Sequence, residues 1–212
     1  MDVIHAIKAG DDDRVRELVS ADQVHARARD ENGVSALLLA RYYGREAAAD
    51  ALRAAAEQLD VFEAAAYGDV RRLRELLDDD PELVNRYAPD GFTPLQLASF
   101  FGQPAAAALL LERGAETNAV AKNPMRVSAL HSAAAAREPE IVRMLLDNGA
   151  DPNAQQEGGF TALQAAAQHG DRDLAELLLD RGARRDLAKD DGETAADVAS
   201  TSGHTELAEL LR

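Results

Sequence analysis

The sequence predicts an all-α fold, a solenoid of about seven helix-turn-helix repeats with hairpin-like fingers between them. The first observation behind this prediction is self-similarity, because Thr93–Ala119 is matched in outline by Ser128–Asn153 and by Thr161–Ala183. The second is phase: in each copy an apolar residue stands seven places before a mid-repeat glycine, or before Arg137 in one copy. A fixed period of roughly 20–50 residues is typical of solenoids, whose units bury apolar surface only against their neighbours.

The spacing of these apolar markers also reveals one irregular join. The markers are Val3, Leu37, Val61, Leu95, Leu130, Leu163 and Ala196. Five of the six intervals are 33 to 35 residues, whereas Leu37 to Val61 is 24. The residues missing there are those that would form a finger. We therefore predict that a helix passes into the next repeat through a short bend near Leu59-Asp60, leaving a notch in the row of fingers. This notch is either a neutral loop deletion or a gap that admits a partner's loop.

Local signals in each repeat agree with a pair of short helices. A Ser or Thr that precedes an apolar run is a typical helix N-cap, and a Gln three residues later completes a capping box. A glycine separates the two helices, and a leucine ridge marks the second helix before a second glycine ends it. The predicted N-caps are Thr93, Ser128, Thr161 and Thr194.

These motifs resemble those of the ankyrin repeat family over nearly all 212 residues. The opening motif reads Thr93-Pro94-Leu95-Gln96-Leu97-Ala98, and the ending Gly149-Ala150-Asp151-Pro152-Asn153-Ala154 is intact. The resemblance implies a single domain and a non-catalytic scaffold that binds another protein on its concave face and finger tips. The expected repeats are approximately 1–29, 30–58, 59–88, 89–121, 122–155, 156–188 and 189–212.

Composition narrows the classes of partner. The formal net charge is −15, which opposes binding to nucleic acid or to an anionic membrane and favours a protein with a basic or apolar surface. The chain has no cysteine, and its first residues lack the features of a signal peptide. We therefore expect a cytoplasmic monomer.

The sequence offers no convincing catalytic, metal or cofactor site. The pair Ser128 and His131 could be mistaken for a nucleophile and its base, but Ser128 fits an N-cap. By the family resemblance, His131 is a structural residue that hydrogen-bonds the neighbouring finger backbone. The histidines lack metal-binding spacing, and the Asp triplets at 11–13 and 78–80 lack the spacing of a calcium loop. We expect no catalytic residue, no metal and no cofactor.

Aromatic residues form the one constellation that indicates a binding site. Eight of the nine lie between residues 42 and 101, and most of them stand directly before a mid-repeat glycine. In ankyrin-like solenoids this end of the first helix lines the concave face, where exposed aromatic rings serve as binding hot spots. The opposing interpretation is that about half of the rings pack between repeats as core. Ala119–Val127 is a longer finger, expected to carry Met125 into solvent. The predicted partner-binding residues are Tyr42, Tyr43, Tyr67, Phe92 (at a finger tip), Phe100, Phe101 and Met125.

Two other functions stay open at this point. The first is a structural module of a larger assembly, because the sequence ends inside a leucine ridge. Wide exposure of Leu207, Leu210 and Leu211 would favour it. The second is a small enzyme on a solenoid scaffold, which would need an acid/base pair in a closed cavity.

Overall fold

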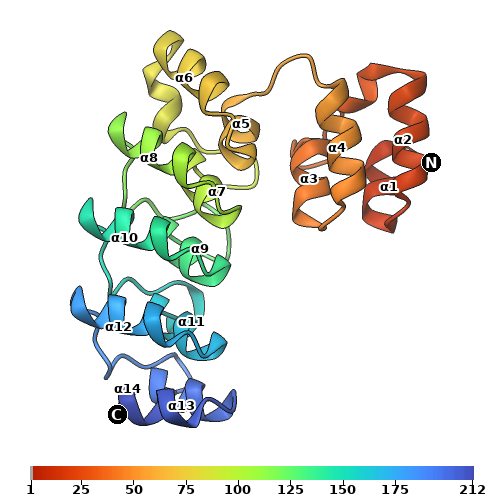
Figure 1. Cartoon of the computed structure of the whole chain (residues 1–212). Coiled ribbons are helices and arrows are strands. Elements are labelled where there is room, and N and C mark those ends of the chain that lie inside the picture. Colours follow the sequence, from red (N-terminus) through yellow and green to blue (C-terminus); the bar gives the residue numbers. More distant parts are fainter. Residues whose placement is uncertain (1) are drawn as a thin grey trace.

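The computed structural model describes residues 2–212, and within that range every regular element is a helix. Fourteen α-helices follow one another in antiparallel pairs (Figure 1). The first helices of the pairs, called inner helices below, are α1 (Val3–Ala9), α3 (Ala36–Tyr42), α5 (Val61–Tyr67), α7 (Pro94–Phe100), α9 (Ala129–Ala136), α11 (Ala162–His169) and α13 (Ala195–Thr201). The outer helices are α2 (Asp12–Ala21), α4 (Glu46–Ala55), α6 (Val70–Asp79), α8 (Pro104–Glu112), α10 (Pro139–Asp147), α12 (Arg172–Asp180) and α14 (Thr205–Leu211). Short 3-10 helices are η1 (Gln23–Arg27), η2 (Pro81–Asn85) and η3 (Glu157–Gly159).

Figure 1 shows α1–α4 as one group of two pairs and α5–α14 as a second stack beyond an extended connection, with the two ends of the chain far apart. From α5 onward each inner helix packs on the inner helix of the next pair, and the same order holds for the outer helices up to α10. Each pair therefore depends on its neighbours for burial, as the predicted solenoid requires. The fold class expected from the sequence is confirmed.

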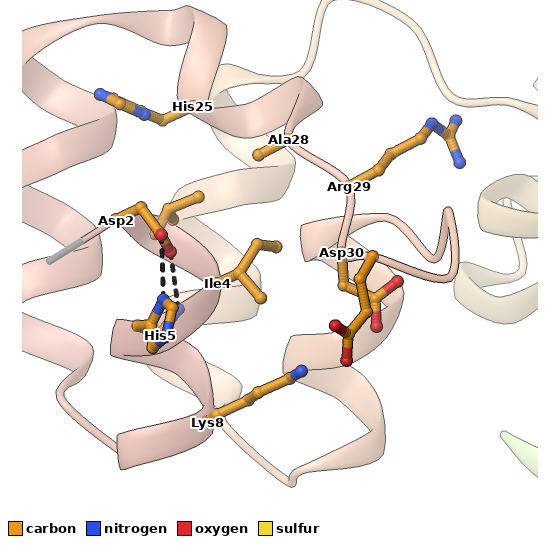
Figure 2. A pocket seen from close by; sticks show the side chains of 10 residues that line it. Asp2, Ile4, His5, Lys8, His25, Ala28, Arg29 and Asp30 are labelled. Carbon is orange, nitrogen blue, oxygen red and sulfur yellow. Dashed lines mark hydrogen bonds and ion pairs between the residues drawn. The ribbon is translucent and has the colours of Figure 1, made fainter.

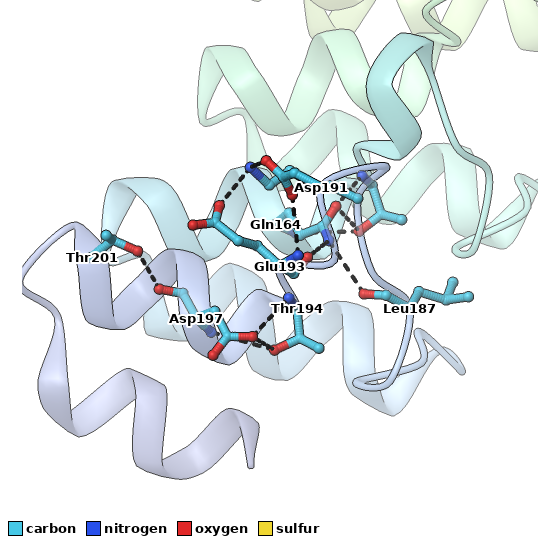
Figure 3. A network of polar contacts seen from close by, with 9 residues as sticks. Gln164, Leu187, Asp191, Glu193, Thr194, Asp197 and Thr201 are labelled. Carbon is cyan, nitrogen blue, oxygen red and sulfur yellow. Dashed lines mark hydrogen bonds and ion pairs between the residues drawn. The ribbon is translucent and has the colours of Figure 1, made fainter.

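Helix starts are fixed by the predicted caps. The side chains of Thr93 and Thr161 each accept a hydrogen bond from the backbone N–H three residues on, and the Gln there reaches back to the cap. Thr194 and Asp197 form the same box in α13 (Figure 3). Each reciprocal box satisfies two backbone groups that a helix start would otherwise leave unpaired.

The core is a continuous strip of alanine and leucine along the stack. Alanines such as Ala98, Ala133 and Ala166 are fully buried in the inner helices, so their small side chains allow close helix approach. Leu110, Leu145 and Leu178 are equally buried in the outer helices and fill the space between pairs. Burying one leucine contributes about 1.5–3 kcal/mol, so the strip supplies most of the favourable term for folding.

Tight turns form the fingers between pairs. Four are closed by a backbone hydrogen bond between residues four apart, at 30–34, 88–92, 156–160 and 189–193. The finger that carries Met125 is closed between Ala121 N and Val127 O at 2.9 Å. It is thus two residues longer than the finger at 156–160, as predicted, and the Met125 side chain is 52% exposed.

The irregular join between the second and third pairs has no finger. Helix α4 ends at Ala55, and α5 begins at Val61 behind the N-cap Asp60. The chain between them makes only a short bend at Glu57-Gln58. The predicted bend and notch are confirmed, and they change the contacts of the neighbouring helix α3.

At the other end of the stack, Leu207 and Leu211 are buried and Leu210 is half-buried. Helix α14 packs on α13, the inner helix of its own repeat. Wide exposure of these leucines was the observation that would have favoured a structural module, and it is not found.

Candidate functional site

The candidate site is an aromatic cluster at the ends of α3 and α7. Tyr42 is the last residue of α3, and Phe100 and Phe101 end α7. The Tyr42 ring centroid lies 5.4 Å from that of Phe101 and 6.2 Å from that of Phe100. Phe92 is the fourth ring, 6.4 Å from Tyr42. Tilted pairs at such distances add about 0.5–1.5 kcal/mol each beyond the area that they bury.

The Tyr42 hydroxyl extends this cluster to a finger. It donates a hydrogen bond of 2.8 Å to Asp90 Oδ2, in the turn between η2 and α7. Burial, together with the charge of Asp90, raises the pKa of Tyr42 well above its ordinary value. The phenol therefore keeps its proton and acts as a fixed donor to the carboxylate.

Tyr42 contacts these partners because the notch has no finger between the end of α3 and the fourth repeat. Asp90 is 48 residues further along the chain, whereas a regular neighbouring repeat would be about 33 away. The bond therefore spans from the second repeat to the fourth. A finger after α4 would stand between them, so its absence lets the end of α3 contact the fourth repeat directly.

Arg41, the residue before Tyr42, joins one more predicted ring to the cluster. Its guanidinium carbon lies 4.8 Å from the centroid of Tyr67 and 4.6 Å from that of Phe101. Its Nη2 also donates to the carbonyl of Ala66 at 3.3 Å. A cation sandwiched in this way contributes about 0.5–1 kcal/mol per ring and fixes the orientation of both.

An apolar hollow of about 330 Å³ opens beside the cluster. Its six lining residues come from three repeats: Tyr42, Asp90, Phe92, Leu97, Phe100 and Met125. The side chains of Phe100 and Met125 are 46% and 52% exposed, so they form its rim toward solvent. Exposed apolar side chains grouped around a recess are typical of interaction sites.

Backbone contacts between two fingers hold the rim in place. Lys122 N donates to Gly91 O at 2.8 Å, and Asn123 Nδ2 donates to Asp90 O at 3.0 Å. Gly91 has φ +86°, and a Cβ there would stand 2.6 Å from the backbone carbon of Lys122. Only glycine allows the two fingers to approach so closely.

The structure gathers five of the seven predicted partner-binding residues around one hollow or its supporting rings. These are Tyr42, Phe92, Phe100, Phe101 and Met125. Tyr67 joins through Arg41, and its ring is half-buried. Tyr43 is 48% exposed and stands outside the ring contacts of residues 2–212. The competing interpretation is thus correct for part of the set, since Tyr42, Tyr67, Phe92 and Phe101 are partly covered.

One predicted placement is wrong, and three residues of the site were not predicted. Phe92 closes its finger through its carbonyl and is not at the tip, which is Pro89-Asp90-Gly91. The sequence analysis did not single out Asp90, Arg41 or Leu97 as residues of the site. The Asp-Gly turn facing an aromatic position was the only available signal for Asp90.

Ser128 and His131 have the structural roles predicted for them. The Ser128 backbone N–H donates to His131 Nδ1 at 3.1 Å, and His131 Nε2 lies 2.9 Å from the carbonyl of Ala154. Burial lowers the pKa of His131, so the ring is neutral and its Nε2–H donates to that carbonyl. Gln96 and Gln164 make the equivalent bonds in neighbouring repeats. Ser128 Oγ also lies 2.8 Å from His131 Nδ1, but Ser128 and His131 are only 4% and 5% exposed, so this contact is part of the buried cap and is not open to a substrate.

A second, polar hollow of about 380 Å³ lies at the N-terminal end (Figure 2). The exposed residue His5 is held there by Asp2, with 2.9 Å between His5 Nδ1 and Asp2 Oδ2. This pair caps α1, because Asp2 also accepts from the His5 backbone N–H. Among residues 2–212, no group of three His, Cys, Asp or Glu side chains has metal-binding geometry.

No helix in the described part of the chain is both long and apolar enough to cross a membrane. Stacked helix pairs, capped inner helices and fingers between the pairs define the class of this protein, a helical repeat solenoid. The family model "Ankyrin repeats (3 copies)" matches residues 61–156 and 130–212. The chain belongs to the ankyrin repeat family.

Similar proteins match about half of the chain. It is 37% identical over 103 residues to ankyrin repeat and SAM domain-containing protein 6 of Rattus norvegicus, covering 49% of this chain and 12% of that protein. The Mus musculus protein of the same name is 35% identical over 103 residues, with the same coverage of both chains. The DNA-binding protein RFXANK of Homo sapiens is 40% identical over 96 residues, 45% of this chain and 35% of that protein. The matches thus span well under two thirds of each relative.

Proposed function

We propose that this protein is a non-catalytic scaffold that binds another protein between its inner helices and its fingers. Ankyrin repeats are generally protein-binding modules. The observation that carries the proposal is the aromatic cluster with its open hollow, since Phe100 and Met125 are exposed around an apolar recess. Large apolar side chains that are grouped around one exposed recess are expected where a partner covers them.

The net charge indicates the kind of partner. A charge of −15 creates a field that speeds encounter with a basic protein and repels an acidic one. A basic or apolar partner surface therefore fits best, and the same repulsion between copies favours a monomer. The cytoplasm is the proposed location, on the absence of cysteine alone.

The human relative is named a DNA-binding protein, and we do not extend that property to this chain. Direct binding to DNA requires clustered Lys and Arg that neutralise phosphates. Here the densest basic segment, Arg71-Arg72, forms ion pairs with Glu75 on the same helix. A gel-shift assay with random-sequence duplex DNA should therefore give no complex at physiological salt.

Affinity capture tests the proposed function, with the purified chain as bait. Three baits are compared: wild type, the double variant Phe100→Ala/Met125→Ala, and Val24→Ala. Val24 is 59% exposed on η1 and serves as a matched apolar control away from the cluster. We expect wild type and Val24→Ala to recover the same proteins and the double variant to lose at least one of them. Identical recovery by all three baits would contradict the proposed site.

A further inference from the structure

We propose that the hollow beside Tyr42 is an anchor pocket for one large apolar side chain, carried by a partner segment with basic residues on both sides of it. This inference rests on the proposed function and specifies the chemistry recognised at the same site. It follows from the size of the hollow, the state of its polar groups and the charges of the fingers around it.

The size of the hollow selects a single side chain. Pockets that enclose a whole small molecule measure about 300–1,000 Å³ and bury most of its surface. This hollow, at about 330 Å³, stands at the lower end of that range and is open toward solvent. It can take up one ring or one branched aliphatic group while the rest of the partner stays outside.

The polar groups of the wall are already satisfied. Asp90 supplies the only carboxylate among the lining residues, and its Oδ2 accepts from the Tyr42 hydroxyl. Its Oδ1 accepts from Phe92 N at 3.3 Å. Apart from the remaining lone pairs of that carboxylate, the lining is apolar or engaged, so an entering polar group would give up its hydrogen bonds to water for little return. The part of the ligand that enters is therefore apolar.

The negative charge of Asp90 remains after these bonds are made. Glu157 is an exposed carboxylate beside the hollow, since its backbone N donates to Met125 O at 3.1 Å, and Glu31 and Asp190 are exposed carboxylates on more distant fingers. Two of the finger cations are engaged within the chain, because Lys122 lies 3.9 Å above the ring of Tyr87 and Lys189 pairs with Asp191 and Glu193. Arg126 is the opposing charge, and it lines a neighbouring hollow with Glu157. The fingers thus favour basic residues beside the anchor.

Residues from both sides of the notch line the hollow. Tyr42 comes from the second repeat, whereas Phe92, Phe100 and Met125 come from the fourth repeat and the finger after it. An occupant that touches both walls binds only while the end of α3 stays against the fourth repeat. Occupancy should therefore stabilise this contact, by the ordinary linkage between binding and conformation.

Methyl NMR on the intact chain tests the anchor, using protein labelled with [methyl-¹³C]Met. The Met125 methyl reports on the hollow, and Met144, half-buried on the outer helix α10, is the internal control. The probes are the peptides acetyl-RKWKR-amide, acetyl-RKAKR-amide and acetyl-EDWDE-amide, and neutral N-acetyltryptophanamide. We expect the Met125 signal to shift with the basic Trp peptide, at an affinity at least fivefold above that for each other probe. The Met144 signal should stay in place.

Several outcomes would overturn the proposal. Equal affinity for the Ala peptide refutes an apolar anchor, and equal affinity for the neutral or acidic Trp probe refutes the basic flanks. If no probe shifts the Met125 signal, both the apolar anchor and the basic flanks are refuted. A shift of the Met125 and Met144 signals together also refutes both. If affinity capture still depends on Phe100 and Met125 in that case, the proposed function stands and only the anchor fails. If neither the Met125 shift nor the dependence of affinity capture on Phe100 and Met125 is observed, the proposed function is rejected as well.

Discussion

The hydrogen bond between Tyr42 and Asp90 allows a quantitative test of the contact across the notch. Tyr42→Phe removes only the hydroxyl, because the phenyl ring keeps its packing against Phe92 and Phe101. Asp90→Ala removes the acceptor and also the weaker bond from Phe92 N. The double variant closes a mutant cycle in which that second loss cancels.

The expected coupling follows from the geometry. A hydrogen bond to a charged group contributes about 1.5–3 kcal/mol net. Both residues are half-buried here, so solvent competes for the carboxylate and the lower part of that range applies. We expect Tyr42→Phe alone to cost about 1.5 kcal/mol of unfolding free energy, and the pair to be coupled by about 1–2 kcal/mol.

Urea unfolding followed by circular dichroism measures the four free energies. Tyr43→Phe is the matched control, because Tyr43 is adjacent in sequence but 48% exposed and outside the cluster. Its coupling to Asp90→Ala should be near zero. A coupling of Tyr42 to Asp90 as small as that of Tyr43 would refute the contact, and with it the explanation of the hollow.

Three further predictions concern single positions in other repeats. His131→Gln should keep the stability at pH 7.5 within about 1 kcal/mol, since glutamine makes the same bonds in neighbouring repeats. Burial lowers the pKa of His131, so the unfolded chain takes up a proton first and wild type loses stability below about pH 6.5. Urea titrations at several pH values should show this decline weakened in the variant; parallel pH curves would contradict it. Burial raises the pKa of Glu63, so its buried carboxylate destabilises the fold at pH 7. The fold is more stable when Glu63 is protonated in acid, and this extra stability is lost as pH rises through the raised pKa. Glu63→Gln should raise the unfolding free energy at pH 7 and leave it unchanged in acid, and a loss of stability at pH 7 would be inconsistent with this. Arg137 has φ 60° where other repeats have glycine, and its ion pair with Asp171 is long, at 3.6 Å, with the Arg137 side chain 59% exposed. Arg137→Gly should therefore raise the unfolding free energy by about 0.5–1 kcal/mol in the same assay, and an unchanged or lower value would argue against backbone strain there.

Much of the fold could be predicted because its signals are local. Capping residues, mid-repeat glycines and leucine ridges each act within one repeat, and their phase repeats along the chain. The shortened interval before Val61 likewise predicted the missing finger, since a finger needs residues that are not present. The structural role of His131 was implied by its place in the motif that this chain shares with the ankyrin family.

The contacts of the candidate site were only partly predictable, because they depend on geometry across the notch. No periodic rule links Tyr42 to Asp90, which lies 48 residues away, and the ring stack of Arg41 has no sequence signature. Tyr43 was grouped with Tyr42 by position. Successive helical residues point in different directions, however, and only Tyr42 meets the fourth repeat.

The account depends most on Tyr42 lying against the fourth repeat in solution. The direct measurement is a set of aromatic nuclear Overhauser effects from the Tyr42 ring in the wild-type chain. We predict cross-peaks to the rings of Phe101 and Phe92, whose centroids lie 5.4 and 6.4 Å away. Cross-peaks from Tyr42 only to residues of α5, as in a regular stack of neighbouring repeats, would contradict the account.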